Sequence, residues 1–121
     1  MRDWPVERPL RRHGCAVLLP TGEVLLAGGI DSTDDTGLLD TDAVLEGEIY
    51  QPGIDWDTGS YGAEESWTTT ARATVPRNYH SVALLLPNGL VLTAGSNLDG
   101  QSGGDSVKEY RIETFSPAVR R

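Results

Sequence analysis

The stretch Pro9–Gly29, PLRRHGCAVLLPTGEVLLAGG, recurs at Pro76–Ser96 as PRNYHSVALLLPNGLVLTAGS. The two copies align without a gap at a constant offset, which the two histidines give as 80 − 13 = 67 residues. Each copy places a Pro-x-Gly turn between two apolar runs, and Gly and Asn tolerate the positive φ that such turns need. Because an internal repeat sets the whole architecture, this pair of stretches decides the fold.

Each copy predicts an antiparallel meander of short strands. The repeat extends to GEIYQP (47–52), which matches IETFSP (112–117). The expected strands are the first at 13–19 and 80–86, the second at 23–28 and 90–95, the third at 43–50 and 107–115, and a fourth only once, at 65–70 with Trp67. The first strands are apolar at every position, which is typical of a strand covered on both faces. In a propeller each blade lies between two neighbours, whereas a sandwich strand normally shows one polar face.

The pattern W…R…H…LLPTG-VLLAGG…EIYQP…W resembles the kelch repeat, whose period of about 50 residues is compatible once long loops are allowed for. More narrowly, VPRNYHSVALLLPNGLVLTAG (75–95) followed by IETFSP resembles galactose oxidase and its glyoxal-oxidase-like relatives, from about Trp4 to Pro117. The resemblance implies an all-β fold, a partial kelch-type β-propeller of about two four-stranded antiparallel blades. It corresponds to the last one and a half to two blades of that family's seven-bladed catalytic domain.

The predicted organisation is a single partial propeller segment. It comprises an outer strand of a preceding blade at 1–8, a first kelch unit at 9–70, a second, incomplete unit at 71–117 and a tail at 118–121. Propellers close as rings of four to eight blades, so two blades alone would expose apolar faces. We therefore expect a piece of a longer protein. The alternative is a ring of several copies, so the expected partners are the remaining propeller blades or other copies of the chain.

Tyr79 and His80 are the candidate site residues. In copper radical oxidases one copper is held by two tyrosines and two histidines, and the resemblance matches Tyr79 to the axial tyrosine and His80 to an equatorial histidine. Imidazole suits Cu(II), and a phenolate can serve both as a ligand and as a base. The meander would place the pair beside the loops 29–42 and 96–106. Alternatively, both residues are strand-entry side chains that satisfy backbone groups without a metal.

The rest of the family's copper site is not identifiable in the sequence. The family needs a cysteine cross-linked to a second tyrosine, and a second histidine from a C-terminal domain. In the family the cross-linking cysteine occupies the repeat position of His13, several blades upstream, so Cys15 is not its counterpart. A buried, inert thiol is expected there instead. His13 follows Arg12 and not a tyrosine, which makes it a poor ligand candidate.

Two functions follow from these features. The first is a segment of a copper radical oxidase whose full-length form oxidises a primary alcohol, an aldehyde or a sugar with O₂ and yields H₂O₂. This chain alone is not expected to be catalytic, which leaves open whether it is an enzyme. The second is a non-catalytic kelch module for protein or glycan interaction, in which Tyr79 and His80 are structural.

The charge composition of the sequence argues against some classes of binding partner. The 121 residues carry 18 acidic against 10 basic side chains, a net charge of −8, which argues against nucleic acid or an anionic membrane surface as the partner. No apolar run approaches the roughly 20 residues that span a bilayer. The start has no apolar signal-peptide core, although relatives are typically secreted, so the compartment stays open.

Four other features receive simpler interpretations. The acidic loop 31–42 does not fit the spacing of a calcium loop and is expected to be solvated. The glycine-rich segment 95–106 lacks the lysine of a phosphate-binding loop and is expected to be a flexible connection. The polar segment 51–67 is predicted to be an insertion between the third and fourth strands. Arg72 and Arg77 are expected to bridge the blades through carbonyl groups.

Overall fold

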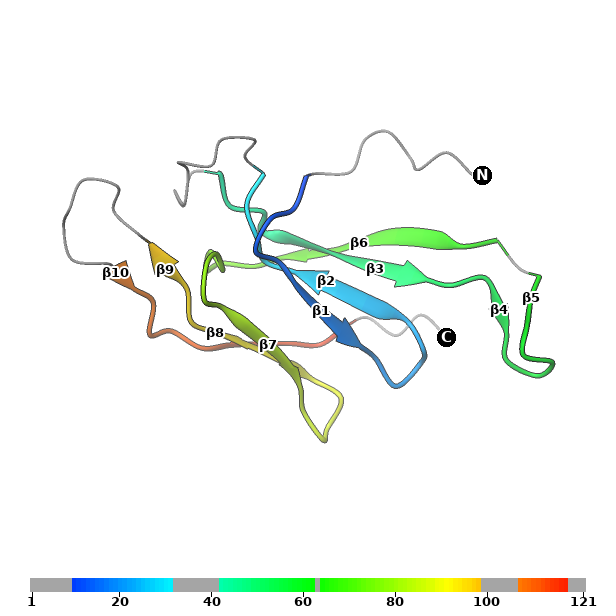
Figure 1. Cartoon of the computed structure of the whole chain (residues 1–121). Coiled ribbons are helices and arrows are strands. Elements are labelled where there is room, and N and C mark those ends of the chain that lie inside the picture. Colours follow the sequence, from blue (N-terminus) through cyan, green and yellow to red (C-terminus); the bar gives the residue numbers. More distant parts are fainter. Residues whose placement is uncertain (1–9, 32–41, 63, 99–106, 118–121) are drawn as a thin grey trace.

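The computed structural model describes residues 10–31, 42–62, 64–98 and 107–117 (Figure 1). Within these ranges the regular elements are β-strands, and every pairing is antiparallel. This confirms the all-β prediction. None of the described residues belongs to a helix that is long and apolar enough to cross a membrane. The predicted outer strand at 1–8, the tail at 118–121 and most of the acidic loop lie outside the described residues.

The first sheet has four strands in the order β1-β2-β3-β6. They are β1 (Cys15–Leu18), β2 (Val24–Ala27), β3 (Glu46–Gln51) and β6 (Ser66–Arg72). Neighbours in this sheet follow one another along the chain, so it is a meander, and Tyr50 of β3 pairs with Trp67 of β6. The single fourth strand predicted around Trp67 is therefore confirmed.

The second sheet repeats the first three strands in the order β11-β8-β7. They are β7 (Val82–Leu85), β8 (Val91–Ala94) and β11 (Glu113–Phe115). Cys15 pairs with Ala27 in the first sheet, and Val82 pairs with Ala94 in the second, so the two hairpins have the same register. The tight turns also match, with φ of 85° at Gly22 and 84° at Gly89. The repeat in the sequence is thus a repeat in the structure.

The third strand of the second copy departs from its prediction as one run over 107–115. Its first part, β10 (Val107–Lys108), pairs with β9 (Asn97–Leu98), and the strand that joins the second sheet begins only at Glu113. Between them, the Arg111 guanidinium binds both carboxylate oxygens of Glu109, each at 2.8 Å. The start of the segment predicted to be a flexible connection is therefore a paired strand.

The insertion between the third and fourth strands contains a small hairpin of β4 (Ile54–Asp55) and β5 (Ser60–Tyr61). The Asp55 carboxylate closes its turn by accepting hydrogen bonds from the amides of residues 57 and 58, at 2.9 and 3.3 Å. Figure 1 shows the hairpin at the far end of the first sheet from β9 and β10. It is an elaboration of the repeat and lies away from the candidate residues.

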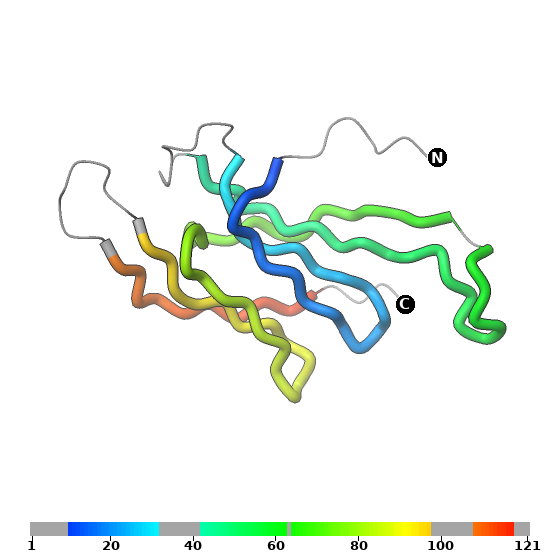
Figure 2. Tube along the Cα trace, viewed as in Figure 1, coloured from blue at the N-terminus to red at the C-terminus, as the bar shows by residue number. Residues whose placement is uncertain are grey.

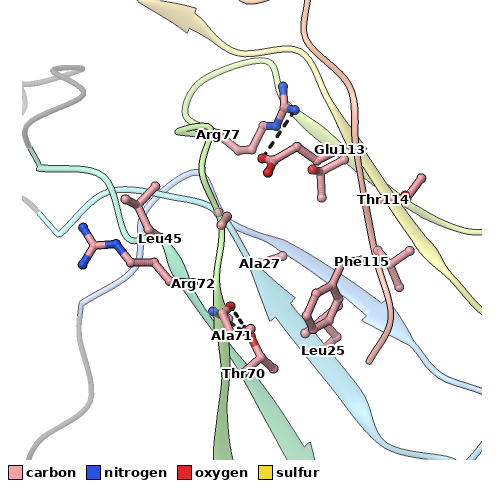
Figure 3. Close-up of a pocket in the computed structure, with 15 residues that line it drawn as sticks. Leu25, Ala27, Leu45, Thr70, Ala71, Arg72, Arg77, Glu113, Thr114 and Phe115 are labelled. Atoms are coloured by element: carbon pink, nitrogen blue, oxygen red, sulfur yellow. Dashed lines mark hydrogen bonds and ion pairs between the residues drawn. The ribbon is translucent and has the colours of Figure 1, made fainter. Parts of the chain in front are cut away.

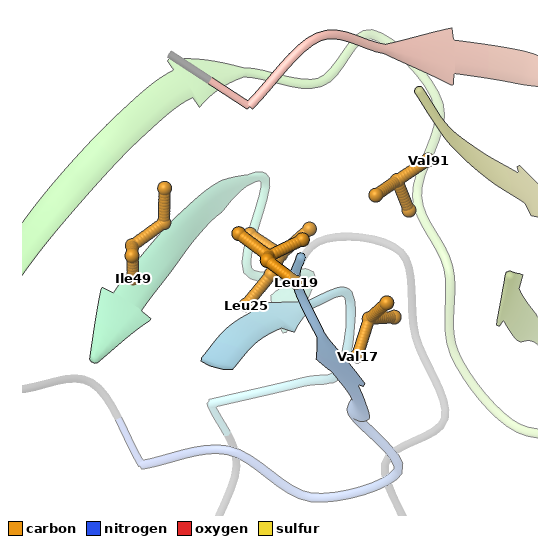
Figure 4. Packing of buried hydrophobic residues seen from close by; sticks show 5 residues of the cluster. All are labelled: Val17, Leu19, Leu25, Ile49 and Val91. Carbon is orange, nitrogen blue, oxygen red and sulfur yellow. The ribbon is translucent and has the colours of Figure 1, made fainter. Parts of the chain in front are cut away.

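The core lies between the two sheets (Figure 4). Its buried members come mainly from the first sheet: Val17, Leu19, Leu25, Ile49 and, from the second, Val91. Because β1 lies against β7 (Figure 2), the inner face of β1 is covered. The outer face of β7 is not covered by described residues, since Val82 is 46% and Leu84 56% exposed. Two units alone thus leave an apolar face open, as expected.

Close main-chain contacts join the sheets. The Gly29 amide donates to the Arg77 carbonyl at 2.6 Å, and the Cys15 thiol lies 3.6 Å from the Ser81 carbonyl. Gly28 has a φ of 71°, and a Cβ there would stand 2.8 Å from the Arg77 carbonyl oxygen. Only glycine permits this approach without displacement of the second sheet. The segment that leads to Tyr79 is therefore held by the end of β2.

Candidate functional site

Tyr79 and His80 are the central residues of a tight turn that enters β7. The Ser81 amide donates to the Asn78 carbonyl at 3.2 Å, and His80 has a φ of 62°. A left-handed conformation is uncommon for a residue with a side chain, and such strain persists only where the surroundings impose it. The turn therefore presents both rings in a fixed conformation at the sheet edge.

The loop after β8 holds this turn from the other side. The Asn97 amide donates to the Tyr79 carbonyl at 2.7 Å. The Asn78 amide donates to the Ser96 hydroxyl at 2.8 Å, and Asn78 is fully buried. The described part of the loop 96–106 thus lies beside Tyr79 and His80, where the meander topology predicts it.

Three aromatic rings from the two sheets meet at this edge. The rings of Tyr79 and His80 are stacked with a centroid separation of 3.7 Å and a tilt of 31°. His13 approaches the Tyr79 ring edge-on at 5.4 Å and 78°. His13 also has a φ of 59°, so it repeats the conformation of His80. Sequence reasoning missed this contact, although the shared repeat position of the two histidines was its signal.

The donor chemistry of these side chains fits copper. Imidazole nitrogens and a phenol oxygen are donors that Cu(II) accepts, and both histidines are exposed while Tyr79 is half-buried. Within the described ranges, no group of three or more His, Cys, Asp or Glu side chains is close enough to hold a metal. Tyr79, His80 and His13 thus bring together a phenol and two imidazoles, but no complete set of metal ligands, in the part of the chain that the structure describes. The half-buried Cys15 thiol faces the Ser81 carbonyl.

A buried arginine, Arg77, lies two residues before Tyr79 and is paired with Glu113 (Figure 3). Arg77 is only 4% exposed; its Nη1 donates to the Gly95 carbonyl at 2.8 Å, and its Nη2 lies 3.9 Å from Glu113 Oε1. The Glu113 carboxylate also accepts the amides of Thr74 and Val75, at 3.2 and 3.1 Å. Figure 3 shows this ion pair at one end of a pocket between the sheets, with Leu25 and Phe115 further along its lining.

Burial and pairing shift both charged groups. Burial lowers the pKa of Arg77, and the nearby Glu113 carboxylate opposes that shift. Burial acts to raise the pKa of Glu113, but hydrogen bonds from Thr74 and Val75 outweigh it, and the net pKa is below the usual value. Both groups are therefore charged at neutral pH and act as a pair.

The first sheet contains the same arrangement. Arg11 binds the Gly28 carbonyl through Nη1, and its Nη2 lies 3.0 Å from the Glu48 carboxylate and 3.1 Å from the Glu46 carbonyl. In the repeat Gly28 corresponds to Gly95, and Glu48 corresponds to the glutamate paired with the second arginine. Each sheet therefore has an arginine that joins the end of its second strand to its third strand.

The expectation that Arg72 and Arg77 bridge the sheets through carbonyl groups is met by neither side chain. The main-chain carbonyl of Arg77 accepts the Gly29 amide, while its side chain binds the Gly95 carbonyl within its own sheet. Arg72 instead makes an exposed ion pair with Glu46 at 3.4 Å, inside the first sheet. The reason is that Arg72 and Glu46 are register partners across β6 and β3, so their side chains lie on the same face of the first sheet.

Two antiparallel sheets with equal registers, packed face to face, define a partial, propeller-like all-β chain. Residues 1–119 match the family model described as glyoxal oxidase N-terminus. The chain therefore belongs to the glyoxal oxidase N-terminal family.

Relatives and a solved structure agree with this membership. The chain is 35% identical over 119 residues to an aldehyde oxidase, GLOX, of Vitis pseudoreticulata, covering 97% of this chain and 21% of that protein. It is 33% identical over 103 residues to aldehyde oxidase GLOX1 of Arabidopsis thaliana, covering 84% of this chain and 16% of that protein. A fungal alcohol oxidase of the AA5 family, solved in complex with copper, superposes with a TM-score of 0.58 at 31% identity, covering 88% of this chain and 19% of that one. The chain thus spans about a fifth of the length of these proteins.

Proposed function

We propose that this chain is a segment of a copper radical oxidase similar to glyoxal and galactose oxidases, and that Tyr79 and His80 are two of the copper ligands. The observation that carries the proposal is the strained Tyr79–His80 turn, which presents a phenol and an imidazole together at one sheet edge. Family membership supports copper as the metal, because a structural relative was solved with copper bound.

The two side chains would have different roles. His80 would donate an imidazole nitrogen to the metal, and Tyr79 would donate its phenolate oxygen and accept the proton of a substrate hydroxyl. When bound, copper would supply the one-electron redox chemistry that lets O₂ oxidise a substrate and form H₂O₂. The names of the relatives point to a primary alcohol or an aldehyde as the substrate class.

The two sheets would be consecutive blades of a kelch-type propeller, with further blades as the partners that cover β7. Its exposed apolar residues Val82 and Leu84 support such a neighbour. The 121-residue chain by itself would bind copper weakly and carry out no oxidation, because Tyr79 and His80 are fewer than the four ligands that the family resemblance implies.

A copper titration tests the ligand assignment. Cu(II) is added to the folded chain, and affinity is measured by competition with a chelator while EPR reports the nitrogen donors. We expect His80→Ala to weaken binding by at least about tenfold and to change the EPR parameters. Tyr79→Phe should remove the phenolate-to-copper absorption band, whereas Tyr61→Phe, which alters an exposed tyrosine of the distant hairpin, should change neither signal.

Equal, weak spectra from the parent chain and from His80→Ala would overturn the assignment. That result would favour the non-catalytic kelch module, in which the turn is structural. Circular dichroism of each variant shows that the comparison is made between folded chains.

A further inference from the structure

The buried arginine next to the candidate ligands performs more than one structural task. Arg77 lies two residues before Tyr79, and a buried charge of this kind is costly unless it is paired and hydrogen-bonded. Its guanidinium reaches two different segments, the end of β8 at Gly95 and the start of β11 at Glu113.

The two segments that Arg77 contacts both form hydrogen bonds with the main chain at or just before the Tyr79–His80 turn. Gly95 is followed by Ser96 and Asn97, which bind the amide of residue 78 and the carbonyl of residue 79. Glu113 holds the amides of residues 74 and 75, just upstream of the same turn. The Arg77–Glu113 pair thus links two sets of contacts, at residues 74–75 and at residues 78–79, that hold the main chain leading into the two candidate ligands.

We propose that Arg77 and Glu113 are positioning residues for the Tyr79–His80 site, holding the turn in its strained conformation without touching the metal. This inference rests on the proposed function for its consequence in metal binding. Groups that hydrogen-bond to metal ligands commonly change metal affinity by about 10- to 100-fold when they are removed, and Arg77 and Glu113 act more indirectly, through the main chain, so we expect an effect at the lower end of that range. The strained φ of 62° at His80 is the feature that needs such support.

The first sheet provides a matched control. Arg11 and Glu48 make a similar pair, in which an arginine reaches the carbonyl after β2 and a glutamate of β3, at 3.0 Å instead of the 3.9 Å between Arg77 and Glu113, and no Tyr-His pair follows them. A purely structural role predicts equal consequences for the two pairs. A positioning role predicts that only the pair at residues 77 and 113 affects the site.

The experiment compares Glu113→Gln with Glu48→Gln, two nearly isosteric changes. Both are expected to lower thermal stability. Only Glu113→Gln should weaken Cu(II) binding, by about tenfold, and shift the EPR parameters. Arg77→Lys keeps the charge and one donor, so it should retain more copper affinity than Arg77→Met.

Amide hydrogen exchange gives a second readout that needs no copper. The amides of Ser81 and Asn97 close and anchor the turn, and we expect Glu113→Gln to accelerate their exchange at least tenfold while Glu48→Gln leaves them unchanged. Unchanged exchange in Glu113→Gln, or equal changes in both variants, would overturn the positioning role. If Glu113→Gln does not fold, Arg77→Lys is judged by the same criteria. If exchange changes in Glu113→Gln and not in Glu48→Gln, but His80→Ala binds Cu(II) as the parent chain does, the positioning role stands and only the copper proposal fails.

Discussion

The first and second sheets have the same hairpin register and the same histidine conformation, with φ of 59° at His13 and 62° at His80. They differ in the residue before that histidine, which is Arg12 in the first sheet and Tyr79 in the second. The backbone is therefore repeated where hydrogen bonds and packing require it. The side chains diverge at the turn, where the fold tolerates change and chemistry can be placed.

The two sheets also differ in how they are covered. Leu25 of β2 is 1% exposed, whereas its repeat partner Leu92 in β8 is only half-buried. Most of the core belongs to the first sheet, and the second sheet packs its inner face on it. The sheet that carries the candidate site is thus the less buried of the two, and several substitutions can test this asymmetry.

The largest expected effect comes from the core of the first sheet. Leu25→Ala should lower the free energy of unfolding by about 2–5 kcal/mol, because a fully buried leucine leaves a cavity. Leu92→Ala should cost about 1–2 kcal/mol, since part of that side chain is already exposed. Urea unfolding followed by circular dichroism measures both. Equal losses would contradict the asymmetry.

Substitution of two repeat-equivalent glycines, Gly28 and Gly95, should destabilise the molecule at different places. A Cβ at Gly28 would stand 2.8 Å from the carbonyl oxygen of Arg77, and one at Gly95 the same distance from the carbonyl oxygen of His80. Alanine at either position should cost about 1–3 kcal/mol, because φ is positive and the contact is too close. Gly95→Ala should also weaken Cu(II) binding, and by more than Gly28→Ala does, because its clash falls on His80 itself whereas the clash at Gly28 falls on Arg77, three residues upstream. Weaker binding in Gly28→Ala alone would reverse our assignment of the site to the second sheet.

A third test uses pH to examine Glu113, the glutamate that pairs with the buried Arg77. The folded-state pKa of Glu113 lies below its ordinary value of 4.5. A depressed pKa stabilises the fold above the unfolded value, and that contribution is lost as the pH falls through the folded value. The free energy of unfolding should therefore fall below about pH 4.5, and less steeply in Glu113→Gln.

The control for this pH series is Glu109, whose pKa is lowered to about 2 by the hydrogen bonds from Arg111. That carboxylate pairs with an exposed guanidinium, so solvent screening should leave little of its effect on stability. Urea titrations between pH 3 and 7 would show whether Glu109→Gln changes the slope as much as Glu113→Gln. An equal change would mean that the exposed pair matters as much as the buried one.

The repeat predicted the strands of the two hairpins because Pro-x-Gly turns and apolar runs are local signals. The break at 109–112 was not predictable in this way, since β10 pairs with β9 over only two residues each, and no apolar run or Pro-x-Gly turn marks these segments. The correspondence between the Arg11–Glu48 pair and the Arg77–Glu113 pair also could not be read from the alignment of the two repeats. Arg11 aligns with Asn78 and not with Arg77, so the same contacts are made from positions that differ by one residue.

The candidate site was predicted only in part, because some of its features are local in the sequence and others depend on packing between the sheets. Tyr79 and His80 are adjacent in sequence, and a dipeptide before an apolar run can be read directly. The contact with His13 depends on how the two sheets pack, which no short pattern encodes. Packing against β7 brings the equivalent turn of the first sheet within 5.4 Å of the Tyr79 ring.

The smallest expected effect tests that contact between the sheets. An edge-on aromatic pair contributes about 0.5–1.5 kcal/mol beyond the area it buries, and His13 is exposed, so His13→Ala should cost about 0.5 kcal/mol. His13→Phe preserves an edge and should cost less. A double-mutant cycle with Tyr79→Leu isolates the pair, and a coupling energy near zero would show that the rings are neighbours without an interaction. A measurable coupling energy would mean that His13, from the first sheet, takes part in orienting Tyr79 in the second sheet.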